Sequence, residues 1–104
     1  MDIPAIQKRI IQNKLNHGFN MDDIGREFLY LYGEVGEAYD AYSRGLPAEE
    51  LGLELADVAI YLLGIAELLG FDMNNEILKK IKINEGRVYE TLPDGSVVKV
   101  ETDQ

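Results

Sequence analysis

The sequence predicts an all-α fold in which a four-helix bundle core is followed by a short C-terminal β-hairpin. Apolar residues recur at spacings of three and four along four stretches, which is the periodicity of helices. The C-terminal stretch instead resembles two short strands around residues 93–96, whose sequence Pro-Asp-Gly-Ser is typical of a turn. A chain of 104 residues suits a single domain. We therefore expect one domain over residues 1–104, with a helical core over 1–87 and the hairpin over 88–101.

Capping residues delimit the first two predicted helices. The first is expected from about Pro4 to Asn16, because proline suits a first helical turn and the glycine at position 18 ends the helix. The second begins after residues 20–23, whose short polar side chains can cap free backbone amides. Each helix carries an apolar stripe that we expect to face the core. The stripe members are Ile6, Ile10, Ile11 and Leu15 in the first helix, and Ile24, Phe28, Leu31, Val35, Ala38 and Tyr42 in the second.

The third predicted helix is apolar nearly all round. Pro47 opens it, Gly70 closes it, and the nearly uninterrupted apolar run covers residues 51–71. Such a helix needs cover on more than one side. A fourth helix, capped by Asp72 or Asn74, should follow. Its apolar residues are Ile77, Leu78 and Ile81.

The composition excludes several classes of function. A net charge of −9 opposes binding to nucleic-acid backbones and to anionic membranes. The absence of cysteine excludes disulfides, thiolate zinc sites and cysteine nucleophiles. Glu54, Asp57 and Glu67 make the third helix a poor membrane span, and no apolar signal-peptide core is visible. We expect a cytoplasmic protein without a nucleic-acid or membrane partner, in which subunit association buries surplus apolar surface.

Two pairs of carboxylates are the main candidate functional residues. Glu34 and Glu37 lie three residues apart on the second helix, and Glu54 and Asp57 repeat that spacing on the third. Each pair therefore shares one helical face, and antiparallel packing would let the two faces meet. Ionised carboxylates near a core require a compensating cation. An all-oxygen set suits Mg²⁺ or Mn²⁺, whereas a di-iron bundle would need Glu-x-x-His. The alternative is that both pairs are ordinary solvated helix faces.

These residues and the segments around them resemble those of a known family. The matching segments are EVGEAYDA, ELADVAIYLLGIAELLGFDM and a later Lys-x-x-x-Asn-x-x-Arg motif. Over about residues 8 to 89, the chain is similar to the MazG-like, all-α nucleoside triphosphate pyrophosphohydrolases. The residues that match the family pattern are Glu34, Glu37, Glu54, Asp57, Lys80, Asn84 and Arg87.

The resemblance implies an enzyme with a helical core that forms homodimers or homotetramers. Its four acids would bind Mg²⁺ and act as the catalytic residues. The substrate would be a nucleoside triphosphate, cleaved between its α and β phosphates to give a monophosphate and pyrophosphate. One position departs from the pattern: many relatives carry an additional glutamate directly before the first acidic pair, where this chain has Gly33. That departure puts the activation of the attacking water in doubt.

Lys80, Asn84 and Arg87 are the candidate phosphate-binding residues. Their spacing of four and three would place them on one helical face. Arginine can bind two phosphate oxygens at once, and lysine supplies a point charge. The alternative is an ordinary solvated last turn, since cations are favoured at helix C-termini.

Gln12, Asn16 and Tyr61 are the candidate base-binding residues. The two amides lie one turn apart on the first helix and could bind the edge of a base, while Tyr61 could stack on it. Aromatic residues at helical spacing are more often part of a core.

Three alternatives to a general triphosphate pyrophosphohydrolase stay open. Phosphoribosyl-ATP pyrophosphohydrolase cleaves the same bond with a related fold, and a dimeric dUTPase or dCTPase is a second enzymatic alternative. A non-catalytic helical interaction protein with a structural metal site is the third, and Gly33 is the feature that favours it.

Overall fold

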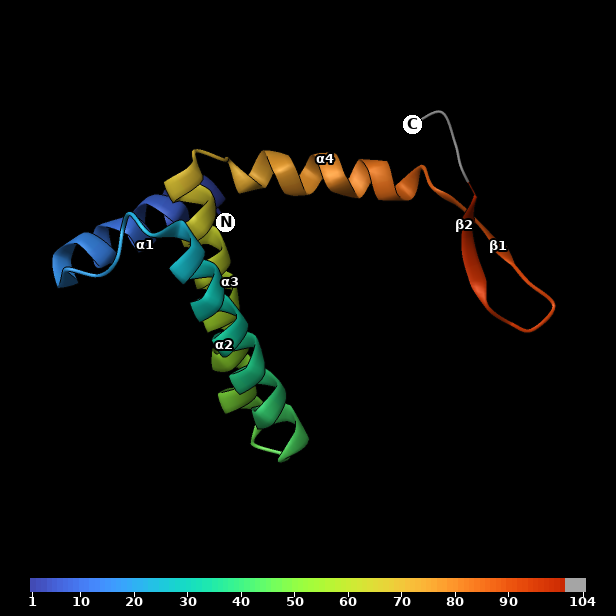
Figure 1. The fold of residues 1–104 in the computed structure, drawn as a ribbon, viewed down its shortest axis with the longest axis horizontal. Helices are drawn as coiled ribbons and strands as arrows, with labels where there is room; N and C mark the ends of the chain where they lie inside the picture. Colours follow the sequence, from blue (N-terminus) through green and yellow to red (C-terminus); the bar gives the residue numbers. More distant parts are fainter. Residues whose placement is uncertain (101–104) are drawn as a thin grey trace. The chain divides into compact units, whose positions relative to one another are not determined.

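The structure is a computed structural model that describes residues 1–100, and the end of the predicted hairpin at residue 101 lies outside that range. The all-α class, with four helices and a C-terminal antiparallel hairpin, is confirmed (Figure 1). The elements are α1 (Ile3–His17), α2 (Ile24–Ser43), α3 (Ala48–Leu69), α4 (Met73–Glu85), β1 (Val88–Thr91) and β2 (Val97–Val100).

Contacts divide the chain into two compact units, one ending at Met73 and the other beginning at Asn74. The single domain over residues 1–104 stays a prediction. None of the helices within residues 1–100 is both long and apolar enough to cross a membrane.

Capping interactions fix both ends of α1 and the start of α2. The Asp2 carboxylate accepts a hydrogen bond from the Ala5 amide at 3.0 Å, and the Asp23 carboxylate accepts one from the Arg26 amide at the same distance. Both satisfy backbone donors that a first helical turn leaves free. At the other end of α1, Gly18 adopts the left-handed conformation with a φ of 67°, which costs glycine little.

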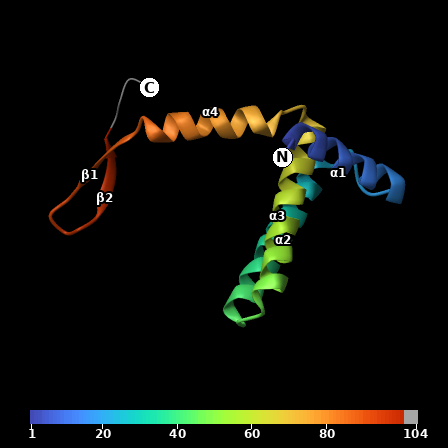
Figure 2. The same cartoon turned by 180° about the vertical axis from the view of Figure 1, so that it is seen from behind.

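Helices α2 and α3 lie side by side as an antiparallel pair (Figures 1 and 2). The short connection over residues 44–47 leaves them no other arrangement. Helix α1 packs on α3, and the side chain of Ile10 lies against α3 at Gly64. A Cβ added there would lie 3.2 Å from Cγ2 of Ile10, so glycine permits this crossing.

The predicted inward face of α2 is wrong in part. Phe28, Val35 and Tyr42 were expected in the core, but all three are exposed, and Ala38 is the buried member of that stripe. The other fully buried residues of α2 are Glu27 and Ala41. Small alanines and carboxylates therefore face α3, because the bulky side chains point away from the pair. We call those exposed residues the outer apolar stripe of α2: Phe28, Tyr32, Val35, Tyr39 and Tyr42.

The inward face of α1 also differs from the prediction. Leu15 is exposed, whereas Gln7 and Lys14, one heptad apart, are buried. Gln7 is 1% exposed and links α1 to the end of α3 by hydrogen bonds. Its amide nitrogen donates to the Phe71 carbonyl at 2.7 Å, and its amide oxygen accepts from the Met73 backbone at 2.9 Å. A buried side chain thus satisfies backbone groups that the α3–α4 connection would otherwise leave unpaired.

The second unit contains most of α4 and the hairpin. Strands β1 and β2 pair in antiparallel register from Val88 opposite Val100 to Thr91 opposite Val97. In the turn, the Asp94 carboxylate accepts hydrogen bonds from the Ser96 amide and hydroxyl, which hold the pKa of Asp94 below its usual value. Every residue of both strands is exposed, and a two-stranded hairpin is marginal on its own.

Replacing Gln7 by alanine should lower the free energy of unfolding by about 2 kcal/mol, because the Phe71 and Met73 backbone groups lose their partner. Urea denaturation followed by circular dichroism measures the change. The matched control is Gln12→Ala on the same helix, where the exposed side chain should leave stability within about 0.5 kcal/mol. Equal midpoints for the two variants would contradict the role given to Gln7.

Candidate metal centre and adjoining cavity

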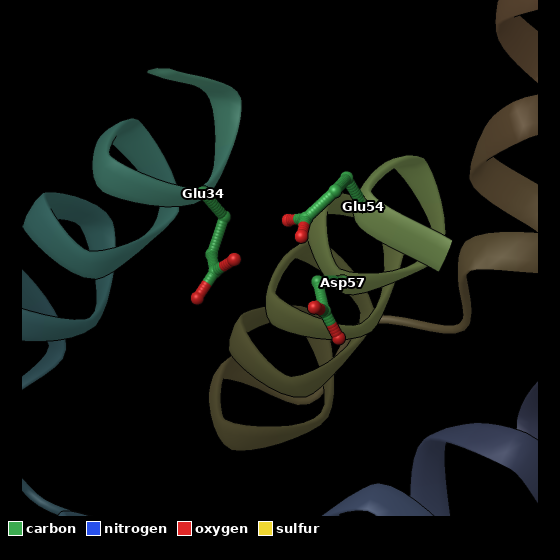
Figure 3. Close-up of side chains that lie close together, drawn as sticks. All are labelled: Glu34, Glu54 and Asp57. Atoms are coloured by element: carbon green, nitrogen blue, oxygen red, sulfur yellow. The ribbon is translucent and has the colours of Figure 1, made fainter. Parts of the chain in front are cut away.

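Three carboxylates meet between α2 and α3. Glu34 comes from α2, and Glu54 and Asp57 come from neighbouring turns of α3 (Figure 3). One oxygen from each lies within 4.8 Å of the others. The antiparallel packing produces this group, because it brings two helical faces of like charge together. The expected meeting of the two acidic faces is therefore observed for three of the four acids.

Two oxygens of this group are buried and unsatisfied. Oε2 of Glu34 and Oε2 of Glu54 have no hydrogen-bond partner, and no ion pair among residues 1–100 involves the three carboxylates. A buried carboxylate oxygen without a partner is costly, so the arrangement fits a bound cation. Since the donors are all carboxylate oxygens, Mg²⁺ and Mn²⁺ are the ions that suit them.

The electrostatics of Glu34 agree with this interpretation. Burial raises the pKa of Glu34, and the neighbouring charge of Glu37, followed by Asp57 and Glu54, raises it further. Desolvation and like charges both disfavour an ionised carboxylate. A divalent ion would reverse both effects.

Glu37 lies at the edge of the group. Glu37 is exposed, yet its charge is near enough to raise the pKa of Glu34. Together with Glu54 and Gly33, it lines a cavity of about 430 Å³. At Gly33, an added Cβ would meet nothing within 4 Å. The position directly before the first acidic pair is therefore open and adjoins the carboxylates.

A larger cavity of about 740 Å³ lies between α1 and α3, within the size range of ligand pockets. Gln12, Asn16 and Tyr61, the predicted base-binding residues, all line it. The Gln12 amide donates to the Asn16 side chain at 2.9 Å. The structure brings these three residues together around one space.

Tyr61 connects this cavity with the carboxylates. It lies one helical turn after Asp57 and contacts Tyr30 edge-on, with ring centroids 6.2 Å apart. Burial raises the pKa of Tyr61, and the charges of Glu27 and Glu34 raise it further. A ligand in the cavity would therefore lie next to the acidic group.

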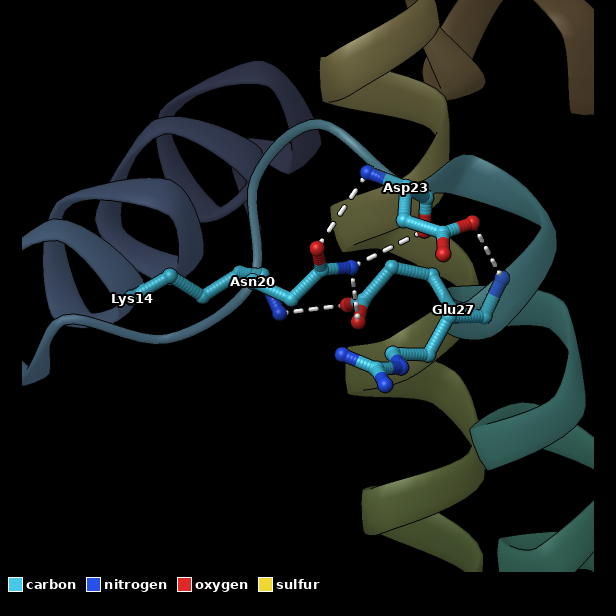
Figure 4. Close-up of polar contacts among 5 residues, drawn as sticks. Lys14, Asn20, Asp23 and Glu27 are labelled. Atoms are coloured by element: carbon cyan, nitrogen blue, oxygen red, sulfur yellow. Dashed lines mark hydrogen bonds and ion pairs between the residues drawn. The ribbon is translucent and has the colours of Figure 1, made fainter.

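One pair of cavity residues was not predicted from the sequence. Lys14 on α1 and Glu27 on α2 both line the cavity and form a buried ion pair (Figure 4). The available signal was the position of Lys14, one heptad after Gln7 on the face of α1 that packs inward.

The predicted phosphate-binding residues lie in the second unit. Lys80 and Asn84 belong to α4, but Arg87 lies beyond its end at Glu85. The expected common helical face is therefore wrong for Arg87, whose backbone amide donates to the Asn84 carbonyl at 3.2 Å. Binding of phosphate by these residues stays a prediction.

Comparisons with known proteins add two findings, while no protein-family model matches the chain. Over 43 residues it is 51% identical to a dATP/dGTP diphosphohydrolase of Salmonella phage PMBT28. This segment is 41% of the chain and spans 15% of the length of the phage protein. The fold is similar to the cyanophage S-2L MazG-like pyrophosphohydrolase, solved with dGDP and three catalytic Mn²⁺ ions per active site. The match has a TM-score of 0.70 and 27% sequence identity, and it covers 97% of this chain and 99% of the cyanophage chain.

Replacing Glu34 by glutamine should stabilise the metal-free protein at neutral pH. A raised pKa in the folded state means that ionisation opposes folding. The wild type therefore loses stability as pH rises from the ordinary value of 4.5 through the raised pKa, and the variant does not. Thermal unfolding with EDTA across that pH range measures the difference.

The same variant should lose most of the increase in melting temperature that Mn²⁺ gives the wild type. Glu90→Gln, an exposed change on β1, is the control and should alter neither property. A Glu34→Gln protein that is less stable without metal and equally stabilised by Mn²⁺ would contradict the assignment.

Proposed function

We propose that this chain, which is MazG-like in its fold and in its acidic residues, is a metal-dependent nucleoside triphosphate pyrophosphohydrolase. The observation that carries the proposal is the group of Glu34, Glu54 and Asp57, with buried unsatisfied oxygens, beside a cavity large enough for a nucleoside. Purine deoxynucleotides are the proposed substrates. The names of the phage relative and of the cyanophage neighbour support that choice.

Glu34, Glu54 and Asp57 would hold the divalent ions, with Glu37 completing the ligand set. Mg²⁺ is the proposed ion, and Mn²⁺, which the cyanophage neighbour binds, can replace it. Bound ions supply positive charge that offsets the charge of the phosphate oxygens in the transition state. The carboxylates would place that charge next to Tyr61, which lines the cavity.

The proposed reaction is hydrolysis at the α phosphorus. A water oxygen forms a bond to that phosphorus, and the bond to the bridging oxygen of the β phosphate breaks. Pyrophosphate leaves with the electron pair, and a carboxylate of the acidic group receives a proton from the water. Lys80, Asn84 and Arg87 stay the proposed phosphate-binding residues, because arginine and lysine can bind phosphate oxygens through charge-assisted hydrogen bonds.

The cavity between α1 and α3 would hold the nucleoside. Gln12 and Asn16 offer amide donors and acceptors to the base, and Tyr61 offers a ring for stacking. Burial of a base among such side chains, with the phosphates directed to the carboxylates, orients the α phosphorus for attack.

A second copy of the chain is the proposed partner, as a homodimer or a homotetramer. The outer apolar stripe of α2 exposes five large side chains, among them Tyr32 at 73% and Tyr39 at 69%. Leu55, Leu62 and Leu69 form a similar exposed row at heptad spacing on α3. Rows of this kind are typical of helical interfaces between subunits.

A non-catalytic metal-binding interaction protein is the second candidate function. Gly33 favours it, because the acid that many relatives carry at this position is missing while the space for it is open. Pyrophosphate release from a panel of nucleotides with Mg²⁺, including phosphoribosyl-ATP, dUTP and dCTP, separates the candidates. Metal-induced stabilisation without turnover would favour the interaction protein.

Replacing Glu54 by glutamine should lower Mg²⁺-dependent pyrophosphate release from dGTP by at least about 100-fold, because one charged ligand is lost. The variant should keep the helical content of the wild type. Glu50→Gln, one turn earlier on α3 and exposed, is the matched control with unchanged turnover. Full activity in the Glu54 variant would overturn the proposed mechanism.

Tyr39→Lys should reduce self-association without unfolding the chain, because the side chain is exposed in a single copy. Sedimentation velocity at micromolar concentration measures the change as a shift from dimer or tetramer toward monomer. Leu15→Lys, which changes an exposed leucine on α1, is the control. A monomeric wild type would refute the proposed partner.

A further inference from the structure

We infer that Lys14 is a specificity-determining residue that selects bases with a carbonyl oxygen beside a ring-nitrogen acceptor, as in 6-oxopurines, over 6-aminopurines. This inference rests on the proposed function, because it takes the cavity as the nucleoside site. It assigns a chemical role to a buried ion pair that the proposed hydrolysis does not use.

Glu27 holds the Lys14 ammonium at a fixed position. Lys14 and Glu27 are 9% and 2% exposed, and the ammonium donates to Oε1 of Glu27. The other carboxylate oxygen, Oε2, accepts from the Asn20 amide at 3.1 Å (Figure 4). Both oxygens of the carboxylate therefore already have a donor.

The loop before α2 holds Glu27 in turn. The Asn20 amide also donates to the Asp23 carbonyl at 2.9 Å, and the Asn20 side-chain oxygen accepts from the Asp23 amide at 3.2 Å. Asp23 caps α2 through the Arg26 amide (Figure 4). The position of the ammonium is thus set by a connected network that extends to the helix end.

The remaining donors of Lys14 are available to a ligand. An ammonium has three N–H groups, and Glu27 is the one hydrogen-bond acceptor that the described residues 1–100 give it. The Tyr61 ring lies over it at 5.8 Å, which occupies one side by a cation–π contact. Since Lys14 lines the cavity, its free N–H groups can be satisfied by acceptors on a bound base.

This donor set distinguishes bases by their edges. Guanine and hypoxanthine present two neighbouring acceptors, O6 and N7, whereas adenine presents N7 beside an amino donor. With adenine, the ammonium faces an amino donor in place of an acceptor, so one of the two hydrogen bonds is lost and two donors oppose each other. Pockets built to hydrogen-bond a group discriminate strongly against analogues that lack it, so we expect a preference of about 10- to 100-fold.

The test is a binding titration with analogues that cannot be hydrolysed. Isothermal calorimetry with Mg²⁺ compares the α,β-methylene triphosphates of deoxyinosine and deoxyadenosine, whose bases differ in the group at position 6 and in whether N1 carries a hydrogen. The wild type should bind the inosine analogue at least about 10-fold more tightly. The 7-deaza form of the deoxyguanosine analogue, which lacks the second acceptor, should bind more weakly than its parent.

A paired variant tests Lys14 itself. Lys14→Met combined with Glu27→Gln removes both charges together, so no buried charge is left without a partner. In the folded variant, the inosine-to-adenosine preference should fall to about twofold or less, while affinity for tripolyphosphate with Mg²⁺ stays unchanged. The ligand comparisons with the wild type decide the inference even if this variant does not fold.

Equal binding of both bases by the wild type, preference for adenine, or an unchanged preference in the paired variant would overturn the inference. Failure of both analogues to bind would overturn it together with the nucleoside site. If the protein prefers the inosine analogue but does not turn over dGTP, the inference about base selection is supported. That result would contradict only the proposed hydrolysis.

Discussion

The packing of α2 against α3 is constrained by the carboxylates that it encloses. Glu34, Glu54 and Asp57 place like charges, two of them with buried unsatisfied oxygens, where most helix pairs have aliphatic side chains. Alanines at positions 38 and 41 let the helices approach closely enough for that group to form. The pair therefore gains little apolar burial from its own interface. Its bulky residues face outward, and the proposed cation and the proposed second copy of the chain would supply the stabilisation that this interface lacks.

Polar side chains also specify how α1 is placed. Gln7 binds backbone groups at the end of α3, and Lys14 binds Glu27 on α2. Both are buried, so an alternative position of α1 would leave charged or polar atoms without partners. An apolar interface tolerates sliding more easily than such directional contacts. The wall of the large cavity is accordingly fixed by hydrogen bonds, which suits the proposed binding of a nucleoside there.

Local chemistry made the helices and three members of the acidic group predictable from sequence. Aspartates and glycines at the helix ends act through neighbouring backbone groups, and a spacing of three residues defines a helical face without tertiary information. The inward faces of α1 and α2 were harder to predict from the sequence. Both helices carry more than one stripe of plausible core residues, and periodicity does not say which stripe meets the same chain. Lys14 and Glu27 were missed because their pairing joins two helices through a loop.

Glu27 and Glu34 are separated by seven residues on one face of α2, and each anchors a different part of the proposed site. Two helical turns correspond to a rise of about 10 Å. Helix α2 would therefore set the distance between the base-binding and the metal-binding parts of the proposed site. Inserting one residue between them would rotate one anchor by about 100° away from the other. The intervening segment should therefore tolerate substitution more readily than any change in its length.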